Sequence, residues 1–315
     1  MRKMKKWLAL GTTAAMTMTM LSECGSSNEA AAPAETTETA SVAATENTEA
    51  VSTTAETEAS AADTEFPADV QAIIDRGVLN VGVKNAVVGF GFQDTITGEY
   101  SGMEITLAEK IADYLGVDVE FTAVTAATRT ELLDSGDIDC VIATFTITDE
   151  RKESWDFSTP YYTDYVTVLV ENSSGIKDLA GLVDKKVGVS SGSTSAKSLV
   201  SAMIDAGVIE GADFDPDTFD PALWTEGVSF QQYDDYPTIS TGLSAGEVDA
   251  FCVDKSILAI YNTESRSYIE DEFAPQEYGV ATTKGSGLSE VVNDLVEGWL
   301  ADGTIDALIE ENGLN

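Results

Sequence analysis

The chain has 315 residues and a formal net charge of −38, from 55 acidic and 17 basic residues, with no histidine. This charge argues strongly against a nucleic-acid partner, because phosphate groups are bound through basic surface. With no histidine and only three cysteines, the sequence lacks any set of residues typical of a metal site. We expect neither a metal nor a cofactor.

The first 23 residues have the features of a secretory signal. Four basic residues lie in the first six positions, and an apolar or small-residue stretch follows from Trp7 to Leu21. This stretch is short for a membrane-spanning helix, which needs ~20 residues. We therefore expect residues 1–23 to be a signal peptide that directs export.

Cys24 follows Leu21, Ser22 and Glu23, and this segment resembles a bacterial lipoprotein signal. In such signals a leucine and small residues precede the cysteine that becomes the lipidated N-terminus. Glu23 departs from the pattern, which usually has Gly, Ala or Ser directly before the cysteine. The resemblance implies a lipid anchor at Cys24, and a free cysteine near an ordinary cleavage site is the alternative.

Residues 24–65 are predicted to be the lipidated cysteine followed by a disordered acidic tether. From Gly25 to Glu65 the chain has nine acidic residues, no Lys or Arg and no aromatic residue. Such a composition cannot bury enough apolar surface to fold. A flexible coil of this length has a root-mean-square reach of roughly 35 Å, which suits a domain that stands off a membrane.

The remaining residues, Phe66–Asn315, suffice for one large domain or two small lobes. Cys140 and Cys252 both lie there, each inside an apolar, strand-like run. We expect two buried free thiols on separate strands rather than a disulfide.

From Asp69 onward, β-rich runs alternate with segments that have apolar residues at helical spacing. This alternation predicts parallel sheets that are covered by helices on both faces. The expected strands are Leu79–Val83, Val117–Val124, Asp139–Ala143, Tyr165–Val170, Lys186–Val189, Val228–Tyr233, Asp249–Val253 and Tyr278–Thr282. The expected helices include Ile105–Leu115, Asp178–Leu182, Leu199–Ile204, Ile239–Ala245 and Leu288–Leu300.

Ligands of open α/β sheets bind beyond the carboxyl ends of the strands, so the residues that follow each strand are informative. Three of the thirteen basic residues in Phe66–Asn315 lie at such positions, namely Lys84, Arg129 and Arg151. In so acidic a chain, this concentration indicates a ligand site with local positive charge. Polar residues also follow the strands: Thr144, Thr146, Ser190, Ser193, Thr194 and Asp254.

Eight segments resemble, in order and at matching spacing, the polar-amino-acid-binding proteins of ATP-driven (ABC) importers. They are Leu79–Lys84, Thr97–Met103, Leu133–Asp139, Ala143–Arg151, Asp156–Tyr162, Val187–Thr194, Gly246–Phe251 and Glu277–Val280. The similarity covers essentially all of Phe66–Asn315. Two further segments, Val124–Arg129 and Val253–Ser256, are similar to the aspartate/glutamate-binding branch.

The resemblance implies a type II periplasmic-binding fold, in which two α/β lobes are joined by two crossing strands and the ligand lies between them. Lobe one would be residues 66–161 plus 279–315, and lobe two residues 165–275. The crossings would lie near Tyr161–Tyr165 and Pro275–Tyr278. Closure on the ligand would be a hinge motion.

The family match also implies roles for the candidate site residues. Arg151 would bind the α-carboxylate of an amino acid as a bidentate donor. Thr146, the amide of Thr144 and the amide of Thr194 at a helix N-terminus would complete that pocket. Asp254 would accept from the α-ammonium, and Ser190 belongs to the same set of residues.

Lys84 and Arg129 are expected to neutralise a side-chain carboxylate. Relatives that select glutamine or basic amino acids tend to have an acidic residue where this chain has Lys84. Glutamate or aspartate is therefore the expected ligand, and another polar amino acid such as glutamine stays open. Each residue also has a structural alternative: Lys84 as a solvated lysine, Arg129 as a helix-surface arginine, and Asp254 as a helix cap.

We expect a binding protein rather than an enzyme, monomeric, anchored to the outer face of the cell membrane and serving an ABC transporter permease. Some proteins of this fold are dehydratases that act on prephenate-like acids, and this is the alternative function. Catalysis needs an acid or base with a tuned pKa, whereas the chain has no histidine and Asp254 is expected to be salt-bridged.

Overall fold

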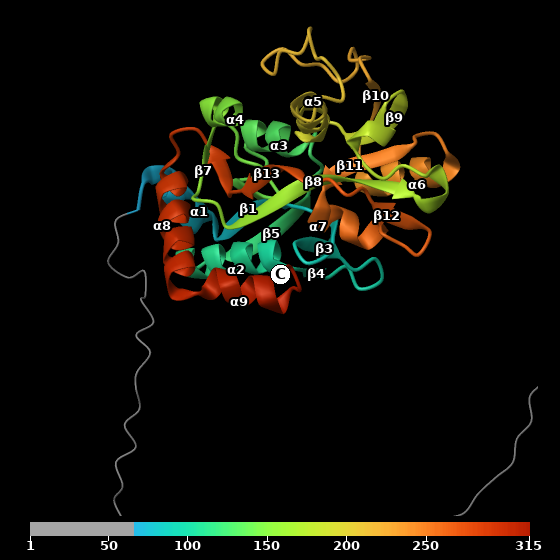
Figure 1. The fold of residues 1–315 in the computed structure, drawn as a ribbon. Coiled ribbons are helices and arrows are strands. Elements are labelled where there is room, and N and C mark those ends of the chain that lie inside the picture. Colours follow the sequence, from blue (N-terminus) through green and yellow to red (C-terminus); the bar gives the residue numbers. More distant parts are fainter. Residues whose placement is uncertain (1–65) are drawn as a thin grey trace, which may run out of the picture. The chain divides into compact units, whose positions relative to one another are not determined.

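The computed structural model of the chain describes residues 66–315 (Figure 1). The expected signal peptide (1–23), the lipidation site Cys24 and the tether (24–65) lie outside the described residues.

The first of two large sheets has the strand order β5-β1-β6-β14-β7. Strand β1 lies between β5 and β6 and pairs in parallel with both. Strand β14 pairs antiparallel with β6 and β7. The bounds are β1 Val78–Val83, β5 Asp118–Ala123, β6 Cys140–Ile142, β7 Trp155–Phe157 and β14 Ala281–Thr283.

The second large sheet has the order β10-β9-β11-β8-β12, and β13 also pairs with β8. Strand β9 is parallel to β10 and β11, whereas β8 is antiparallel to β11, β12 and β13. The bounds are β8 Tyr162–Glu171, β9 Lys185–Ser190, β10 Val228–Tyr233, β11 Ala250–Asp254, β12 Arg266–Tyr268 and β13 Phe273–Tyr278. A small third sheet contains β2 Ala86–Val87, β3 Gly91–Gln93 and β4 Tyr100–Ser101.

Helices cover both faces of each large sheet. In the first sheet, α1, α2, α8 and α9 bury apolar residues against one face and α3 packs on the other. In the second sheet, α5 packs on the face formed by Val166, Val168 and Val170, and α6 packs on the opposite face. The bounds are α1 Ala68–Arg76, α2 Met103–Leu115, α3 Arg129–Ser135, α4 Asp149–Ser154, α5 Ser195–Asp205, α6 Tyr236–Ala245, α7 Lys255–Leu258, α8 Gly287–Asp302 and α9 Thr304–Glu311; three 3₁₀ turns are Asn172–Ser174, Leu179–Leu182 and Ala259–Tyr261.

We call each large sheet with its helices a lobe, the first lobe containing β1 and the second containing β9. The chain passes from the first lobe into β8, and it returns through β13 to β14. The start of β8 and the end of β13 are paired, with Tyr162 opposite Tyr278 and Tyr165 opposite Pro275. These paired segments are called the hinge strands here, and the long arrow of β8 is clear in Figure 1.

The expectation of parallel sheets was wrong, because both sheets are mixed. Alternation of strands and helices indicates parallel neighbours, but β14 and β8 are each inserted antiparallel by connections from the other lobe. The expected strand Tyr278–Thr282 is also divided: β13 ends at Tyr278 in one sheet, and β14 begins at Ala281 in the other. The helix expected at Asp178–Leu182 is a 3₁₀ turn.

One expectation about side chains is confirmed. Cys140 in β6 and Cys252 in β11 are buried and free, as predicted. Residues 66–315 contain no cluster of three potential metal ligands, and none of their helices is long and apolar enough to cross a membrane.

Candidate functional site

The predicted site residues lie in three adjoining cavities between the two lobes, which share Ala126 as a common wall. The smallest, about 10 Å³, is lined by Arg129, Thr144, Thr146, Thr194 and Asp254 among others. A cavity of about 30 Å³ contains Lys84 and Ser190. A third, of about 330 Å³, contains Arg151 together with Arg129 and Thr194. All eight predicted residues are therefore brought together.

Arg151 is positioned by the short helix α4, whose N-cap Thr148 accepts a hydrogen bond from the Arg151 amide. Its Nη1 donates to the Thr146 carbonyl at 2.6 Å in the first lobe, and its Nη2 donates to the Gly192 carbonyl at 3.1 Å in the second. Burial, together with the neighbouring Arg129 charge, lowers the pKa of Arg151 to about 9. The guanidinium therefore joins the lobes at a place where an anion would relieve the excess of positive charge.

Arg129 is the first residue of α3, and only 3% of its surface is exposed. Its Nη1 donates to the carbonyls of Ala143 and Thr144 at 3.0 and 3.2 Å, and its guanidinium stacks over the Phe145 ring at 3.8 Å. Burial lowers its pKa. The alternative of a helix-surface arginine is wrong, although part of the donor capacity of Arg129 is used on backbone carbonyls.

Lys84 directly follows β1 and is 3% exposed, so it is not the solvated lysine of the alternative interpretation. Its Nζ lies 5.3 Å from the centre of the Tyr236 ring and has no hydrogen-bond partner among residues 66–315. Burial, then the nearby Arg129 charge, lowers its pKa well below the ordinary value. An ammonium group without acceptors in a buried position favours an acceptor brought by a ligand.

Asp254 ends β11 and precedes α7, but its side chain makes no capping hydrogen bond to that helix. The carboxylate accepts from the Tyr278 hydroxyl at 2.5 Å. Within the described residues it forms no ion pair, so the expected salt bridge is not made by a protein side chain. Burial, together with the charge of Asp164, raises the pKa of Asp254 to about 7.

The amide of Thr144, predicted to face a ligand, instead donates to Glu104 Oε1 at 2.6 Å. Glu104 lies in α2 with its side chain fully buried, and the same oxygen accepts from the Tyr161 hydroxyl at 2.6 Å. Burial raises the pKa of Glu104 to about 6. Thr144 has a left-handed backbone, with φ 44°, so Glu104 holds a strained residue in place at the site.

Gln276 of β13 links two threonines of the site, one from each lobe. Its Oε1 accepts from Thr146 Oγ1 at 2.8 Å in the first lobe and from Thr194 Oγ1 at 2.7 Å in the second. Thr194 precedes α5 and makes no side-chain capping bond to that helix.

Glu104 and Gln276 are residues beside the site that sequence reasoning missed. Glu104 had one available signal, an acidic residue inside the apolar stripe of α2.

At Gly192 the backbones of the two lobes approach each other closely. Its φ is +73°, and a Cβ there would lie 2.7 Å from the carbonyl oxygen of Ala126. We expect Gly192→Ala to lower ligand affinity about tenfold or more, because the left-handed backbone disfavours alanine by about 1–2 kcal/mol and the contact opposes closure. Titration calorimetry measures the change.

Gly246→Ala is the matched control for that substitution. Gly246 has a similar φ of +72°, but nothing lies within 4 Å of the added Cβ. It should lower the melting temperature and leave ligand affinity unchanged. Equal losses of affinity in both variants would contradict a role for the Gly192–Ala126 approach.

The site thus contains both planar cationic donors and a carboxylate, a combination that can bind a carboxylate and an ammonium of one molecule.

Known proteins are similar to this chain in sequence and in fold. Residues 79–314 match the family model described as bacterial extracellular solute-binding proteins, family 3. The L-cystine-binding protein TcyJ of Escherichia coli (strain K12) is 33% identical over 243 residues, 75% of this chain and 83% of that protein. The ABC transporter glutamine-binding protein GlnH of Bacillus subtilis (strain 168) is 32% identical over 247 residues, 76% of this chain and 82% of that protein. Among solved structures, an ancestral arginine-binding protein bound to arginine has 34% identity and a TM-score of 0.62, covering 75% of this chain and 98% of that one.

Proposed function

Because the chain belongs to family 3 of the bacterial extracellular solute-binding proteins, we propose that it captures an acidic amino acid, glutamate or aspartate, for an ABC uptake transporter. Proteins of this family bind amino acids outside the cytoplasm. The two-lobed type II periplasmic-binding fold brings the ligand between lobes that close around it.

The α-carboxylate is bound by Arg151, with the amides of Thr146 and Thr194 beside it, and the α-ammonium is bound by Asp254. The position of Arg151 supports this role, because its two terminal nitrogen atoms bond carbonyls of both lobes. Asp254 lines the same small cavity as the two threonines. One zwitterion thus bridges the lobes, and its binding favours closure.

The observation that carries the choice of an acidic side chain is the buried Lys84 ammonium, which has no partner among the described residues. Lys84 lies near Arg129, whose charge helps to lower its pKa, so the two cations oppose each other in the unliganded site. A dicarboxylic amino acid brings a second carboxylate, which would stabilise both charges. Burying charge without a partner is costly, so the site favours such a ligand over a neutral or basic one.

Titration calorimetry of the unfolded, dialysed and refolded protein against the common amino acids tests the proposal. Refolding removes any amino acid that co-purifies. We expect glutamate or aspartate to bind at least tenfold more tightly than the others. A preference for glutamine or arginine would overturn the acidic ligand and leave amino-acid capture standing.

We also propose how the chain is organised and where it acts. Lobe one comprises residues 66–161 plus 279–315 and lobe two residues 165–275. The protein acts as a monomer, delivers its ligand to a permease, and is held at the membrane by a lipid on Cys24. Metabolic labelling with a radioactive fatty acid tests the anchor, since Cys24→Ser should remove the label.

Binding should depend on pH through Asp254, whose pKa is raised by burial to about 7. An ammonium is bound by the ionised carboxylate, so affinity should be highest above pH 7 and fall about tenfold per pH unit below it. Calorimetry between pH 5 and pH 8.5 measures this dependence. A flat profile would contradict the role of Asp254.

The unliganded fold should show the opposite trend. The folded pKa of Asp254 lies above the ordinary value of 3.8, so its protonated form stabilises the fold. This contribution is fully present below about pH 4 and is lost as the pH rises through about 7. Thermal melting without ligand, compared with Asp254→Asn, separates this contribution from that of Glu104.

A dehydratase is the second candidate, favoured by one observation. Burial raises the pKa of Glu104 to about 6 and of Asp254 to about 7, the range useful to a general acid. Incubation of the protein with prephenate, followed by detection of the aromatic product, tests this candidate. We expect no turnover, because Asp254 is assigned to hold an ammonium that prephenate lacks.

A further inference from the structure

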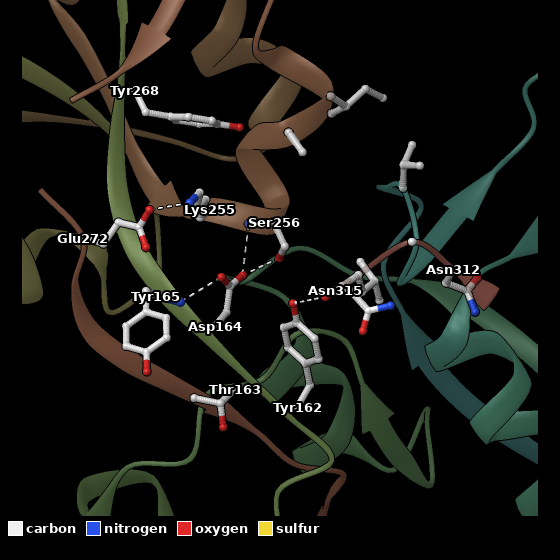
Figure 2. A pocket seen from close by; sticks show the side chains of 15 residues that line it. Tyr162, Thr163, Asp164, Tyr165, Lys255, Ser256, Tyr268, Glu272, Asn312 and Asn315 are labelled. Carbon is white, nitrogen blue, oxygen red and sulfur yellow. Dashed lines mark hydrogen bonds and ion pairs between the residues drawn. The ribbon is translucent and has the colours of Figure 1, made fainter. Parts of the chain in front are cut away.

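A cavity of about 590 Å³ lies beside the hinge strands, apart from the amino-acid site (Figure 2). The first lobe contributes Val88 and Leu314 to its wall, and the second lobe contributes Ile260 and Tyr268. Its floor is the start of β8, from Tyr162 to Tyr165. Cavities of about 300–1,000 Å³ with mostly apolar walls and a few fixed polar groups are typical of small-molecule sites.

The charged groups of this cavity favour a cation. Asp164 and Glu272 are acidic, and Lys255 is the basic residue of the lining. Lys255 already pairs with Glu272 and lies 6.0 Å from the centre of the Tyr268 ring. The side chains of the lining therefore have one negative charge in excess, in a chain whose net charge of −38 attracts cations.

Aromatic and aliphatic groups surround these charges. Tyr162, Tyr165 and Tyr268 line the cavity, and the side chains of Val88, Tyr165 and Ile260 are each about half exposed. Aromatic rings attract cations over their faces, and tyrosine does so without losing its apolar contact surface. This lining suits an organic cation with an apolar body better than a small inorganic ion.

A hydrogen-bonded path connects this cavity with the amino-acid site. The Tyr278 hydroxyl donates to Asp254 at 2.5 Å and lies 3.2 Å from Asp164 Oδ2. Asp164 also accepts from the amide and hydroxyl of Ser256, which lines the cavity. In Figure 1, α3, α4 and α5 lie on one side of β8, and α7 with the β3–β4 hairpin lies on the other. A rotation of the lobes about the hinge strands therefore widens the hinge cavity when it narrows the amino-acid site, and narrows the hinge cavity when it widens that site.

We propose that this hinge cavity is a second ligand site, which takes a small organic cation with an apolar body and, when occupied, holds the amino-acid site closed. An occupant that contacts Val88 on the first lobe and Ile260 on the second fixes the angle between the lobes. The occupant therefore raises the affinity for the amino acid. By thermodynamic linkage, the amino acid raises the affinity for the occupant by the same factor. The direction of this coupling rests on the proposed function, whereas binding of the cation does not.

Phenethylammonium is the probe, with 2-phenylethanol and 3-phenylpropionate as its neutral and anionic counterparts. Calorimetry on the refolded protein without amino acid should give at least tenfold tighter binding of the cation than of either counterpart. Glu272→Gln should remove this preference. Glu270→Gln, an exposed acid outside the cavity lining, should preserve it. Equal binding of the three probes, or a preference that survives Glu272→Gln, would overturn the site.

The coupling is measured by titrating the amino acid with and without saturating phenethylammonium. Affinity should rise about fivefold or more, the lower range of allosteric coupling. Competition between the two ligands would overturn the inference, because it would mean that the probe enters the amino-acid site. If the probe binds with charge preference but no amino acid binds, the proposed function fails and the hinge site stands.

Discussion

Replacing Arg151 with alanine is expected to abolish measurable amino-acid binding while the protein stays folded. The guanidinium donates to backbone carbonyls of both lobes, Thr146 in the first and Gly192 in the second. Removing one member of a buried charge pair costs ~2–5 kcal/mol, which corresponds to about a 30- to 4,000-fold loss of affinity. Titration calorimetry measures the loss, and circular dichroism checks the fold.

Two variants at the same helix sharpen this result. Lys152→Ala removes the next positive charge of α4, which is 55% exposed and 3.6 Å from Asp149, and it should leave affinity unchanged. Arg151→Lys keeps the charge but not the bidentate geometry, so we expect an intermediate loss. Micromolar binding by Arg151→Ala would contradict the assignment of this residue to the α-carboxylate.

Replacing Lys84 with aspartate is expected to invert the selectivity of the site. The wild-type ammonium is buried near Arg129 and lacks a protein acceptor within residues 66–315, so a ligand carboxylate is its natural partner. An aspartate at this position repels acidic ligands and accepts from an amide or an ammonium. The affinity for glutamate and aspartate should fall by at least 100-fold relative to glutamine and asparagine.

Three comparisons separate charge from packing in this experiment. Lys84→Met removes the charge and keeps an apolar side chain, so it should reduce the ratio of acid to amide affinity without inverting it. Lys186→Asp makes the same charge change at an exposed lysine and should leave the ratio unchanged. Arg129→Met should weaken the acids more than the amides, but less selectively than Lys84→Met, because Arg129 already binds two carbonyls. Equal losses for acids and amides would mean that these residues serve the scaffold.

The strands and main helices were predictable from sequence because their signals are local. Apolar runs predicted β1, β5, β6 and β9–β11, and helical periodicity predicted α2, α5, α6 and α8. The antiparallel insertion of β8 and β14 depends on pairing with residues 80 or more positions away in sequence, such as Val166 with Asp254 and Thr282 with Cys140. No local pattern encodes such pairing.

The same distinction divides the residues of the site. Lys84, Arg129, Arg151 and Asp254 were predictable because each is a charged residue directly after a strand or in a family segment. The role of Gln276 depends on two hydroxyls that are 130 and 82 positions away in sequence. The same holds for Glu104, which accepts a hydrogen bond from the Thr144 amide, 40 positions away in sequence. This amide was expected to donate to the ligand.

The two buried thiols make this protein suitable for a single-label fluorescent sensor. Cys140 and Cys252 are inaccessible, and burial raises the pKa of both, so neither supplies the thiolate that reacts with a maleimide dye. With Cys24 replaced by serine, one cysteine introduced at the exposed Val88 would be the accessible attachment point among residues 66–315. A dye there would lie on the edge of the hinge cavity and report opening and closing of the lobes as a change in emission.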